Sequence, residues 1–168
     1  DVDSHTGNLD LNKAEVALQQ DNSIKAIIPI HMYGQACAMD KVMDLAQKYG
    51  LKVIEDAGDA LNAEVQMGDK TVKAGTIGDT GCFSFHPHKL LGAYGDGGMI
   101  VTNDDLLDKK LRILRDHGAN PPYIHLLLGY NSRLDALQAA LLDVQIKYLQ
   151  AWTEQQQKAA KKYMDLLD

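Results

Sequence analysis

The 168-residue chain has little of several features that mark particular classes of protein. It holds only two cysteines, Cys37 and Cys82, and neither belongs to a CxxC pair, so the sequence offers no zinc or redox motif. We expect two small buried thiols, no bound metal, and a reduced, cytoplasmic setting. No apolar run is long enough to span a bilayer and no signal peptide is visible, so a membrane-spanning protein is not favoured.

Positive charge is also scarce. Seventeen Lys and Arg residues stand against 23 Asp and Glu residues, which gives a formal net charge of −6. Proteins that bind nucleic acids or membrane surfaces usually carry a basic excess, so neither partner is expected. Hydrophobic residues make up 45% of the chain and charged residues 24%, a balance typical of a folded globular protein. The length is sufficient for one domain with a substantial core.

The first half of the chain contains a strand–helix–strand pattern. The apolar run 26–30 predicts a buried strand, although Pro29 cannot donate to a ladder and suggests that the strand ends there. Apolar residues at helical spacing predict a helix over about 38–49, with Gly50 placed to end it. Residues 52–56 predict a second strand. Two strands joined by a helix in about thirty residues indicate a βαβ unit and a parallel sheet.

The middle of the chain is interpreted as an irregular region followed by two strands. Residues 57 to about 80 contain four glycines and predict no regular element. Short strands are predicted at 82–85 and 99–102, and the segment between them is then a candidate functional loop.

The remainder is predicted to be mainly helical. Asn103 or Asp104 is placed to cap a helix over about 104–116, and residues 117–131 suggest an ordered loop. A long helix is predicted from about 133 to 166, with an apolar stripe that serves either the core or a dimer seam. The predicted fold class is therefore α/β, with one domain, a mostly parallel sheet and a long C-terminal helix.

The loop after the predicted strand at 82–85 contains the most informative residue. Lys89 lies between this strand and the glycine-rich turn 92–98, and a lysine amine can become a nucleophile when its surroundings favour the uncharged form. Glycines let the backbone approach a ligand closely, and the Ser84 hydroxyl is a potential phosphate donor. Most lysines beside glycines are nevertheless solvated surface residues, so this pattern by itself is weak.

Asp56 strengthens the hypothesis. It ends a predicted parallel strand, and open α/β sheets bind ligands at the carboxyl ends of their strands. Enzymes that use pyridoxal 5′-phosphate (PLP) need a carboxylate against the pyridine nitrogen and a lysine for the aldehyde. Asp56 and Lys89 supply this pair of residue types. The alternative is that Asp56 only caps the turn that follows it.

Ordered motifs along the chain carry a family resemblance. From about Asp1 to Tyr163 the sequence resembles the DegT/DnrJ/EryC1/StrS family of PLP-dependent nucleotide-sugar aminotransferases. The matching segments are 1–10, 28–35 with Met39-Asp40, 53–57, 78–85, Lys89 with 95–98, 114–118, 129–135 and 138–140. The resemblance implies a type I, aspartate-aminotransferase-like fold, and residues 1–168 would form part of the PLP-binding large domain.

The resemblance also implies roles for individual residues. Lys89 would hold the cofactor as a Schiff base and then shuttle the proton of the 1,3-prototropic shift. Asp56 would hold the pyridinium, and Ser84 would contact the phosphate. Asn131 would reach the cofactor phosphate of the neighbouring subunit in a homodimer with a shared active site, with Arg133 a weaker candidate for the same role.

Further residues match the family less firmly. His31 and Tyr33 would line the substrate pocket, although a structural role for His31 is equally expected. His86 matches a subset of the family and would face the substrate, whereas His88 stands where smaller residues are common.

The sequence departs from the family pattern beside the site. Asp59 stands where the family usually has Gln, and its carboxylate would face the anionic phenolic oxygen of the cofactor. Leu61 and Asn62 replace a common His-Gly pair, and Leu90 follows the lysine where Asn or Pro is usual. An N-terminal phosphate loop and a C-terminal small domain, which family members carry, have no counterpart in residues 1–168. We therefore expect a central fragment of such an enzyme.

The function predicted from these features is transfer of an amino group from an amino-acid donor, glutamate in the first instance, to a keto group of a nucleotide-linked sugar. The 92–98 turn resembles members that act on 3-keto sugars and His86 resembles some that act on 4-keto sugars, so the position of amination stays open. One alternative is a PLP-dependent sugar dehydratase, in which a histidine replaces the lysine. The other is a non-catalytic PLP-binding or interaction module.

Overall fold

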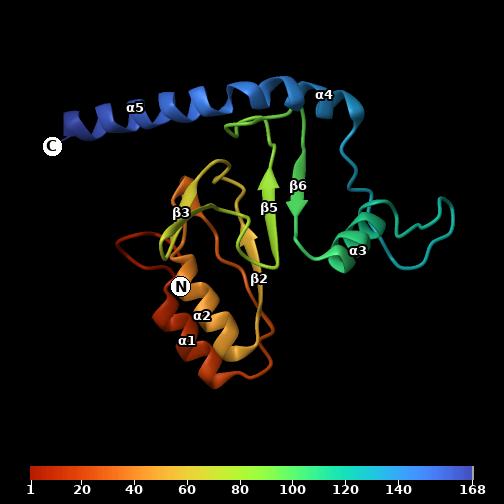
Figure 1. Cartoon of the computed structure of the whole chain (residues 1–168), viewed down its shortest axis with the longest axis horizontal. Helices are drawn as coiled ribbons and strands as arrows, with labels where there is room; N and C mark the ends of the chain where they lie inside the picture. Colours follow the sequence, from red (N-terminus) through yellow and green to blue (C-terminus); the bar gives the residue numbers. More distant parts are fainter. Residues whose placement is uncertain (168) are drawn as a thin grey trace.

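The computed structural model describes residues 1–167, so Asp168, the last residue of the predicted large-domain range, lies outside the described residues. Figure 1 shows the chain with its elements labelled. In chain order they are α1 (Leu11–Gln20), β1 (Ala26–Ile27), η1 (Met32–Gly34), α2 (Met39–Tyr49), β2 (Lys52–Asp56), β3 (Glu64–Met67), β4 (Lys70–Lys73), β5 (Thr80–Ser84), β6 (Gly98–Val101), α3 (Asp105–Arg115), α4 (Ala136–Gln145), η2 (Ile146–Tyr148) and α5 (Leu149–Leu167).

The main sheet is mostly parallel, as predicted. Its four strands lie in the order β1-β2-β5-β6, with β1–β2 and β2–β5 parallel and β5–β6 antiparallel. In the central pair Asp56 lies opposite Cys82, so β2 and β5 end close to one another at the same edge. The functional loop predicted after β5 therefore begins at the carboxyl edge of the sheet.

The first strand is shorter than the predicted range 26–30. Only Ala26 and Ile27 form ladder pairs with β2, followed by an isolated parallel bridge between Ile30 and Asp56. Pro29 has no N–H to donate, but its carbonyl accepts from the Asp56 N–H at 2.9 Å. The chain thus stays beside β2 while the regular ladder ends, which is the interruption that proline predicts.

Helix α2 follows the predicted pattern closely. Its buried residues Met39, Val42, Leu45 and Ala46 share one face and belong to the core beside β2. The helix ends at Gly50, whose φ of 65° is left-handed and whose N–H donates to the Ala46 carbonyl. Glycine adopts this conformation without the steric cost that a Cβ would add. The predicted end of the helix is confirmed.

The β3–β4 hairpin and helix α1 were not predicted. The region expected to be irregular contains an antiparallel hairpin of β3 and β4, in which Val65 pairs with Val72. The alternation in these four-residue strands is too short to stand out among the surrounding glycines. Helix α1 was also missed, although Asp10 is an ordinary N-cap whose carboxylate accepts from the Asn12 and Lys13 N–H groups.

The C-terminal helices agree with the prediction apart from their ends. Helix α3 begins after Asp104, whose carboxylate caps it, and the long helix begins at Ala136 rather than about 133. The long helix includes a 3₁₀ turn, η2, between α4 and α5, and its backbone stays helical across the junction. No helix of residues 1–167 is both long enough and apolar enough to cross a membrane.

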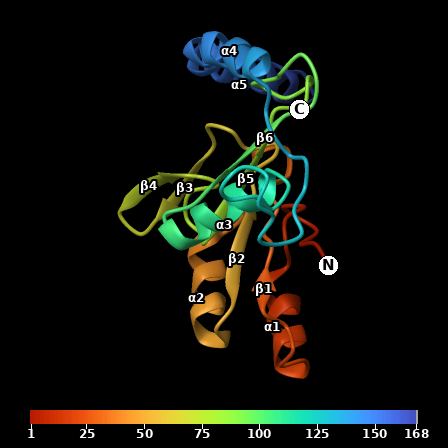
Figure 2. The ribbon, with the colours of Figure 1, turned by 90° about the vertical axis from the view of Figure 1, so that its right-hand side faces the viewer.

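The arrangement of the elements places the strand ends beneath the long helix. In Figure 1, α4 and α5 cross above the arrowheads of β2 and β5, and α1 and α2 lie together at the opposite end of these strands. The view in Figure 2 shows the same long helix above the sheet and the β3–β4 hairpin projecting to one side. The carboxyl edge of the sheet therefore faces the long helix.

Candidate functional site

The ends of β2 and β5 form the base of the candidate site. Asp56 ends β2 opposite Cys82, and Ser84 ends β5 two residues further on. Gly58 lies between them, since a Cβ added there would be 3.1 Å from Asp56 Oδ1 and 3.6 Å from Ser84 Cβ. A side chain at position 58 would occupy space next to both of these polar groups. The glycine leaves that space free for a ligand.

The turn after β2 is held by short backbone and side-chain hydrogen bonds. Asp56 Oδ1 accepts from the Gly58 N–H at 3.0 Å, and the Ala57 N–H donates to the Cys82 carbonyl at 2.9 Å. Ala57 and Ala60 are almost fully buried, so the turn is anchored at both ends of the Gly58-Asp59 pair. Asp59 consequently has a fixed position at the strand edge.

Lys89 reaches this turn from the loop after β5. Its Nζ donates to the Asp59 carboxylate in an ion pair whose side chains are 30% and 35% exposed. Asp59 is only three residues beyond Asp56, so the ion pair brings the lysine amine to the turn on which Asp56 stands. The two residue types predicted to hold PLP are therefore found at one edge of the sheet, with the amine held by a second carboxylate.

The loop from 86 to 97 is folded back on β5. The Phe85 N–H donates to the Gly97 carbonyl at 2.8 Å, and the Ala93 N–H donates to the Phe85 carbonyl at 2.8 Å. A Cβ at Gly92 would lie 2.6 Å from the Pro87 carbonyl oxygen, so this position requires glycine. Lys89 thus stands on a compact turn rather than on a free surface segment.

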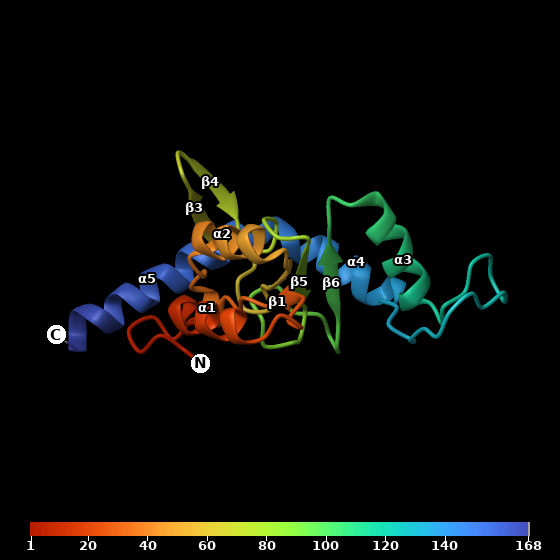
Figure 3. The same cartoon turned by 90° about the horizontal axis from the view of Figure 1, so that it is seen from below.

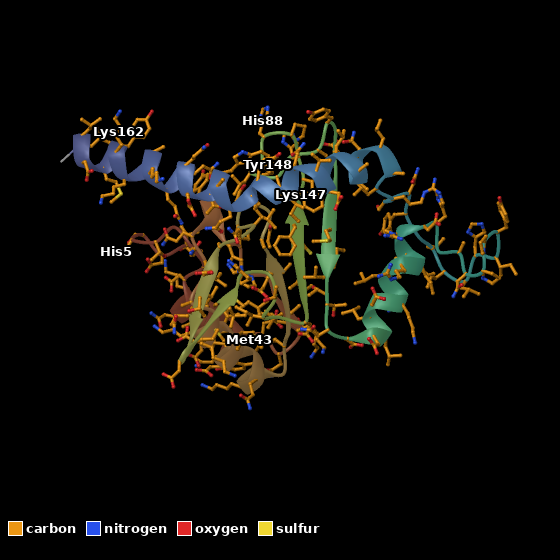
Figure 4. The ribbon with its side chains drawn as sticks, turned by 45° about the horizontal axis from the view of Figure 1, so that its top comes forward. His5, Met43, His88, Lys147, Tyr148 and Lys162 are labelled. Carbon is orange, nitrogen blue, oxygen red and sulfur yellow. The ribbon has the colours of Figure 1, made fainter. Side chains whose placement is uncertain are left out.

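An open groove separates this loop from the long helix. It has a volume of about 790 Å³ and is lined by Pro87, Lys89, Leu90, Gly92, Ala93, Tyr94, Gly95, Gln145 and Trp152. Figure 4 shows His88 on the same loop, beside the part of the helix that carries Lys147 and Tyr148. The lysine amine therefore lies between the strand ends and a groove that a larger ligand can enter.

Ser84 and the two loop histidines are linked by hydrogen bonds. Ser84 Oγ accepts from the His86 N–H at 3.2 Å, and His86 Nδ1 accepts from the His88 N–H at 3.3 Å. The two imidazole rings meet edge to face, with centroids 5.2 Å apart. Because Ser84 Oγ acts here as an acceptor, its own proton remains for donation to an anionic ligand.

His31 has a structural position. Its side chain is fully buried, its Nδ1 accepts from the Cys37 N–H at 3.1 Å, and its Nε2 lies 3.0 Å from Glu55 Oε2. A backbone N–H can only donate, so Nδ1 carries no proton and Nε2–H donates to the carboxylate. Both ring nitrogens are therefore used inside the protein, which supports the structural alternative for His31 over substrate contact.

Glu55 is an important residue that the sequence analysis passed over. Its buried carboxylate accepts from His31 and from the N–H groups of Gly75, Ile77 and Gly78, at 2.8, 2.6 and 2.6 Å for the three backbone donors. Burial alone would raise the pKa of Glu55, but these four donors together hold it below its ordinary value. The sequence did contain a signal for Glu55, since a charged residue within a buried strand needs hydrogen-bond partners in the core.

Two of the remaining predicted residues, Asn131 and Arg133, lie apart from Lys89 in this chain. Asn131 forms an isolated bridge with Asp116 at the end of α3, and Arg133 Nε is 3.6 Å from the Asp116 carboxylate. Figure 3 shows α3 and the segment that follows it at the far end of the molecule from α1 and α2, beyond β6. Tyr33 is 90% exposed, with a φ of 55°. The structure does not bring Asn131 or Arg133 to the lysine.

The cysteines differ from the expected pair of buried thiols. Cys37 is buried and its Sγ–H donates to the Ile30 carbonyl, whereas Cys82 is only partly buried. Burial and the neighbouring Asp56 charge raise the pKa of the Cys82 thiol, so it stays protonated and weakly reactive. Within residues 1–167, no group of His, Cys, Asp and Glu side chains is suited to hold a metal ion.

Two curated proteins are similar to most or all of the chain. The "pleiotropic regulatory protein" of Geobacillus stearothermophilus is 48% identical over 168 residues, which cover all of this chain and 44% of that protein. A UDP-N-acetyl-3-dehydro-alpha-D-glucosamine 3-aminotransferase of Acidithiobacillus ferrooxidans is 49% identical over 143 residues, which cover 85% of this chain and 38% of that protein. The chain thus spans less than half the length of these relatives.

Known structures and family profiles agree with these relatives. DesV of S. venezuelae, solved in complex with a ketimine intermediate, matches 98% of this chain and 43% of its own with a TM-score of 0.88 and 34% identity. The type I aminotransferase fold predicted from the sequence is confirmed. The profile of one family matches every residue from 1 to 168, and the chain belongs to that family, the DegT/DnrJ/EryC1/StrS aminotransferases.

Proposed function

We propose that the protein is a PLP-dependent aminotransferase that moves an amino group from an amino-acid donor to a keto group of a nucleotide-linked sugar. The observation that carries this proposal is the position of the Lys89 amine against the turn that begins at Asp56. The family membership supports it, as does the relative that is named as a 3-aminotransferase of a UDP-linked sugar. Residues 1–168 would form part of the cofactor-binding large domain.

The residues at the strand edge fit PLP. Asp56 Oδ1 accepts one hydrogen bond, from Gly58, and within residues 1–167 no donor reaches Oδ2. That oxygen is available for a protonated pyridine nitrogen. Ser84 offers a hydroxyl for the phosphate, and the absence of a side chain at Gly58 leaves room between the two. When bound, PLP supplies an electron sink for the carbon that loses its proton.

The roles of the protein groups follow from these positions. Lys89 would hold the cofactor through its Nζ, and its free amine would serve as the group that carries a proton at the reacting carbon. Asp56 would hold the protonated pyridine nitrogen, which would strengthen the electron sink that PLP supplies. The groove beside Lys89, between the loop and the long helix, is the proposed entry for the sugar, with His86 on its loop and Tyr33 as further candidate contacts.

A homodimer with shared sites accounts for the separated residues. Asn131 and Arg133 stand on the segment after α3, away from the strand ends of their own chain. We propose that this segment reaches the site of a second copy, where Asn131 would contact the cofactor phosphate and Arg133 would assist it. Glutamate is proposed as the amino donor on the basis of the family resemblance.

Reduction with borohydride tests the cofactor proposal. After incubation with PLP, reduction and digestion, mass spectrometry should find the pyridoxyl group on the peptide that contains Lys89. Lys89→Ala should remove this label, whereas Lys73→Ala, which changes a lysine of the β3–β4 hairpin, should not. Label distributed over many surface lysines, or none at all, would contradict the proposed role of Lys89.

An assay for the product amine tests the reaction. The protein with PLP and glutamate is expected to convert a UDP-linked 3-keto or 4-keto sugar into an amino sugar with release of 2-oxoglutarate. The two substrates compared side by side would identify the position of amination. Loss of a sugar hydroxyl as water without amine formation would instead identify a dehydratase. Cofactor binding with neither product would identify a non-catalytic module.

A further inference from the structure

Asp59 distinguishes this chain from the glutamine pattern expected at the same position. We propose, on the basis of the function proposed above, that Asp59 is a counter-ion that competes with PLP for Lys89 and limits cofactor loading. Asp59 would lower the reactivity of the Lys89 amine before the cofactor binds. The proposal concerns the cofactor-free protein and is therefore testable without turnover.

The ion pair is a fixed feature of the site rather than an accidental surface contact. Asp59 stands on a turn anchored by the buried Ala57 and Ala60, and Gly34 packs against the Asp59 backbone, since a Cβ there would lie 3.3 Å from the Asp59 carbonyl oxygen. Lys89 stands on a turn closed by its own N–H, which donates to the His86 carbonyl at 2.9 Å. Both partners are about two-thirds buried, so water screens the pair less than it would a fully exposed one.

Besides Lys89, these two turns carry two carboxylates and two histidines. Asp56 and Asp59 lie on the turn after β2, and His86 and His88 lie on the loop that carries the lysine. Of the two carboxylates, Asp59 makes the direct contact with the ammonium. Asp56 accepts instead from the Gly58 N–H. Lys89 is thus paired with Asp59. Asp56, the acid proposed to hold the pyridine nitrogen, does not make this contact.

An ion-paired ammonium cannot attach the cofactor. The ammonium must leave Asp59 and lose one proton to solvent before its nitrogen has a lone pair. The lone pair then attacks the aldehyde carbon and a C=N bond forms. The carbonyl oxygen takes the two protons of the neutral amine and leaves as water. Asp59 would also oppose the bound state, because its carboxylate would repel the anionic phenolic oxygen of the cofactor, whereas a glutamine amide could donate a hydrogen bond to it.

The reactivity of Lys89 in the cofactor-free protein tests the first effect. Competitive labelling with acetic anhydride, quantified peptide by peptide by mass spectrometry, compares each lysine amine in the complete natural protein. In Asp59→Asn and Asp59→Gln, labelling of Lys89 should rise about fivefold, the size expected when a partly exposed ion pair is removed. Labelling of Lys52, which pairs with Asp79 at 2.7 Å, should not change.

Glu64→Gln is the matched control for charge. It removes one carboxylate from the Lys73–Glu64 pair on the hairpin, where the two atoms are 2.9 Å apart. This variant has the same net charge as Asp59→Gln, and it should raise the labelling of Lys73 while leaving that of Lys89 unchanged. A rise at Lys89 in both variants would show a general charge effect and would overturn the proposal.

Cofactor affinity tests the second effect. Titration with PLP, followed by the absorbance of the lysine-bound form, should give a lower dissociation constant for Asp59→Gln than for the wild type, with Asp59→Asn between them because its amide is one carbon shorter. If both variants bind PLP no more tightly than the wild type while PLP still labels Lys89, the proposal for Asp59 is overturned and the proposed function is not. Failure of PLP to label Lys89 in every variant would overturn the proposed function as well.

Discussion

Glu55 and Asp56 are neighbours on β2 whose side chains have opposite surroundings. Successive residues of a strand point to opposite faces, so Glu55 enters the buried side and Asp56 stands at the candidate site. Glu55 is fully buried and receives four hydrogen bonds from His31 and the 75–78 segment. A buried charge satisfied in this way fixes the segment that leads into β5.

Replacement of Glu55 tests how much its buried hydrogen bonds stabilise the fold. Glu55→Gln keeps the shape but places an amide NH₂ group among backbone N–H donors, which leaves donors unpaired in a buried position. We expect the free energy of unfolding to fall by about 3 kcal/mol. Urea denaturation followed by circular dichroism measures this change. Glu64→Gln, at an exposed pair, should cost less than about 1 kcal/mol by comparison. An equal fall in the free energy of unfolding of the two variants would show that the buried hydrogen bonds of Glu55 add no stability beyond that of an exposed pair.

The same carboxylate predicts the direction of the acid dependence. Its pKa in the folded protein lies below the ordinary value of 4.5, because the His31 and backbone donors outweigh the effect of burial. The stabilisation by Glu55 is therefore complete above about pH 4.5 and is lost as the pH falls through the lowered folded pKa. Urea midpoints measured from pH 6 down to pH 3 should fall less steeply in Glu55→Gln than in the wild type. Parallel profiles would contradict the assignment.

At the scale of elements, the helices show which local signals are reliable. Helices α2 and α3 were predicted because their caps and apolar spacing agree, with Gly50 at one end of α2 and Asp104 at the start of α3. Helix α1 has an equally good cap, but Leu11, Val16 and Leu18 are its only large apolar residues, so its apolar pattern is faint. The β3–β4 hairpin has four residues per strand and was concealed by glycines on both sides.

The cap of α3 gives a prediction that concerns one element. Asp104 accepts from the N–H groups of Leu106 and Leu107 at 2.8 and 3.1 Å, and these donors have no partner within the helix. Asp104→Ala should reduce the free energy of unfolding by about 1 kcal/mol, whereas Asp104→Asn should cost much less because asparagine is also a good N-cap. Chemical denaturation of the two variants measures the difference. Equal effects would show that the cap hydrogen bonds are not responsible.

Asn62 connects two elements that are distant in sequence. Its Nδ2 donates to Gln150 Oε1 and to Thr153 Oγ1, both at 3.1 Å, so the start of the hairpin is tied to α5. The backbone of Asn62 has a φ of 70°, a conformation that glycine adopts as easily. The sequence showed only that Leu61-Asn62 departs from the family pattern. It gave no indication that the second residue contacts the long helix.

Substitution by glycine isolates the effect of the Asn62 side chain. In Asn62→Gly the backbone conformation is preserved and the contacts with α5 are lost, so hydrogen exchange should become faster in β3, β4 and the first turn of α5. Exchange in α2 should stay unchanged. Asn62→Ala should unfold more easily than Asn62→Gly, because alanine resists the left-handed conformation. Unchanged exchange in Asn62→Gly would show that the hairpin is held by other contacts.

At the scale of the whole molecule, the chain exposes apolar surface on elements remote from its core. Met99 and Ile100 of β6 are 44% and 52% exposed, and no residue of α3 is buried. Leu137 and Val144 of the long helix are also exposed. Surfaces of this kind usually mark contacts with other protein surface. Strand β6 and helices α3 and α4, which carry these residues, lie on the same side of the fold as the segment that follows α3 (Figures 1 and 3), which is consistent with the proposed shared site.

Mixed dimers test the shared site. If Lys89 and Asn131 of one site come from different chains, a dimer of one Lys89→Ala chain and one Asn131→Ala chain contains one intact site. Random reassociation of the two variants should then restore activity above that of either parent, approaching about one quarter of the wild-type value. Lys89→Ala mixed with Asp56→Asn should restore nothing, since both residues belong to the same chain's part of the site. Restoration in neither mixture would place Asn131 outside the shared site.

The sequence by itself determined the local structure and the family. Cap residues, apolar spacing and the apolar runs at strands act over a few neighbouring residues, so they predicted α2, α3, β2, β5, β6 and the long helix. The residue types of the site were also visible, because Lys89 and Asp56 each lie next to a predicted strand end. Ordered motifs along the chain then identified the family before any distance was known.

Only the tertiary structure decided which side chains meet. The pairing of Lys89 with Asp59, the burial of His31 against Glu55 and the contact of Asn62 with α5 join residues 24 to 91 positions apart. Such contacts depend on the parallel order of β1, β2 and β5 and on the path of the long helix over their ends. Local preferences carry no information about these relations, because the free energy of a long-range contact is gained only after the whole chain has packed.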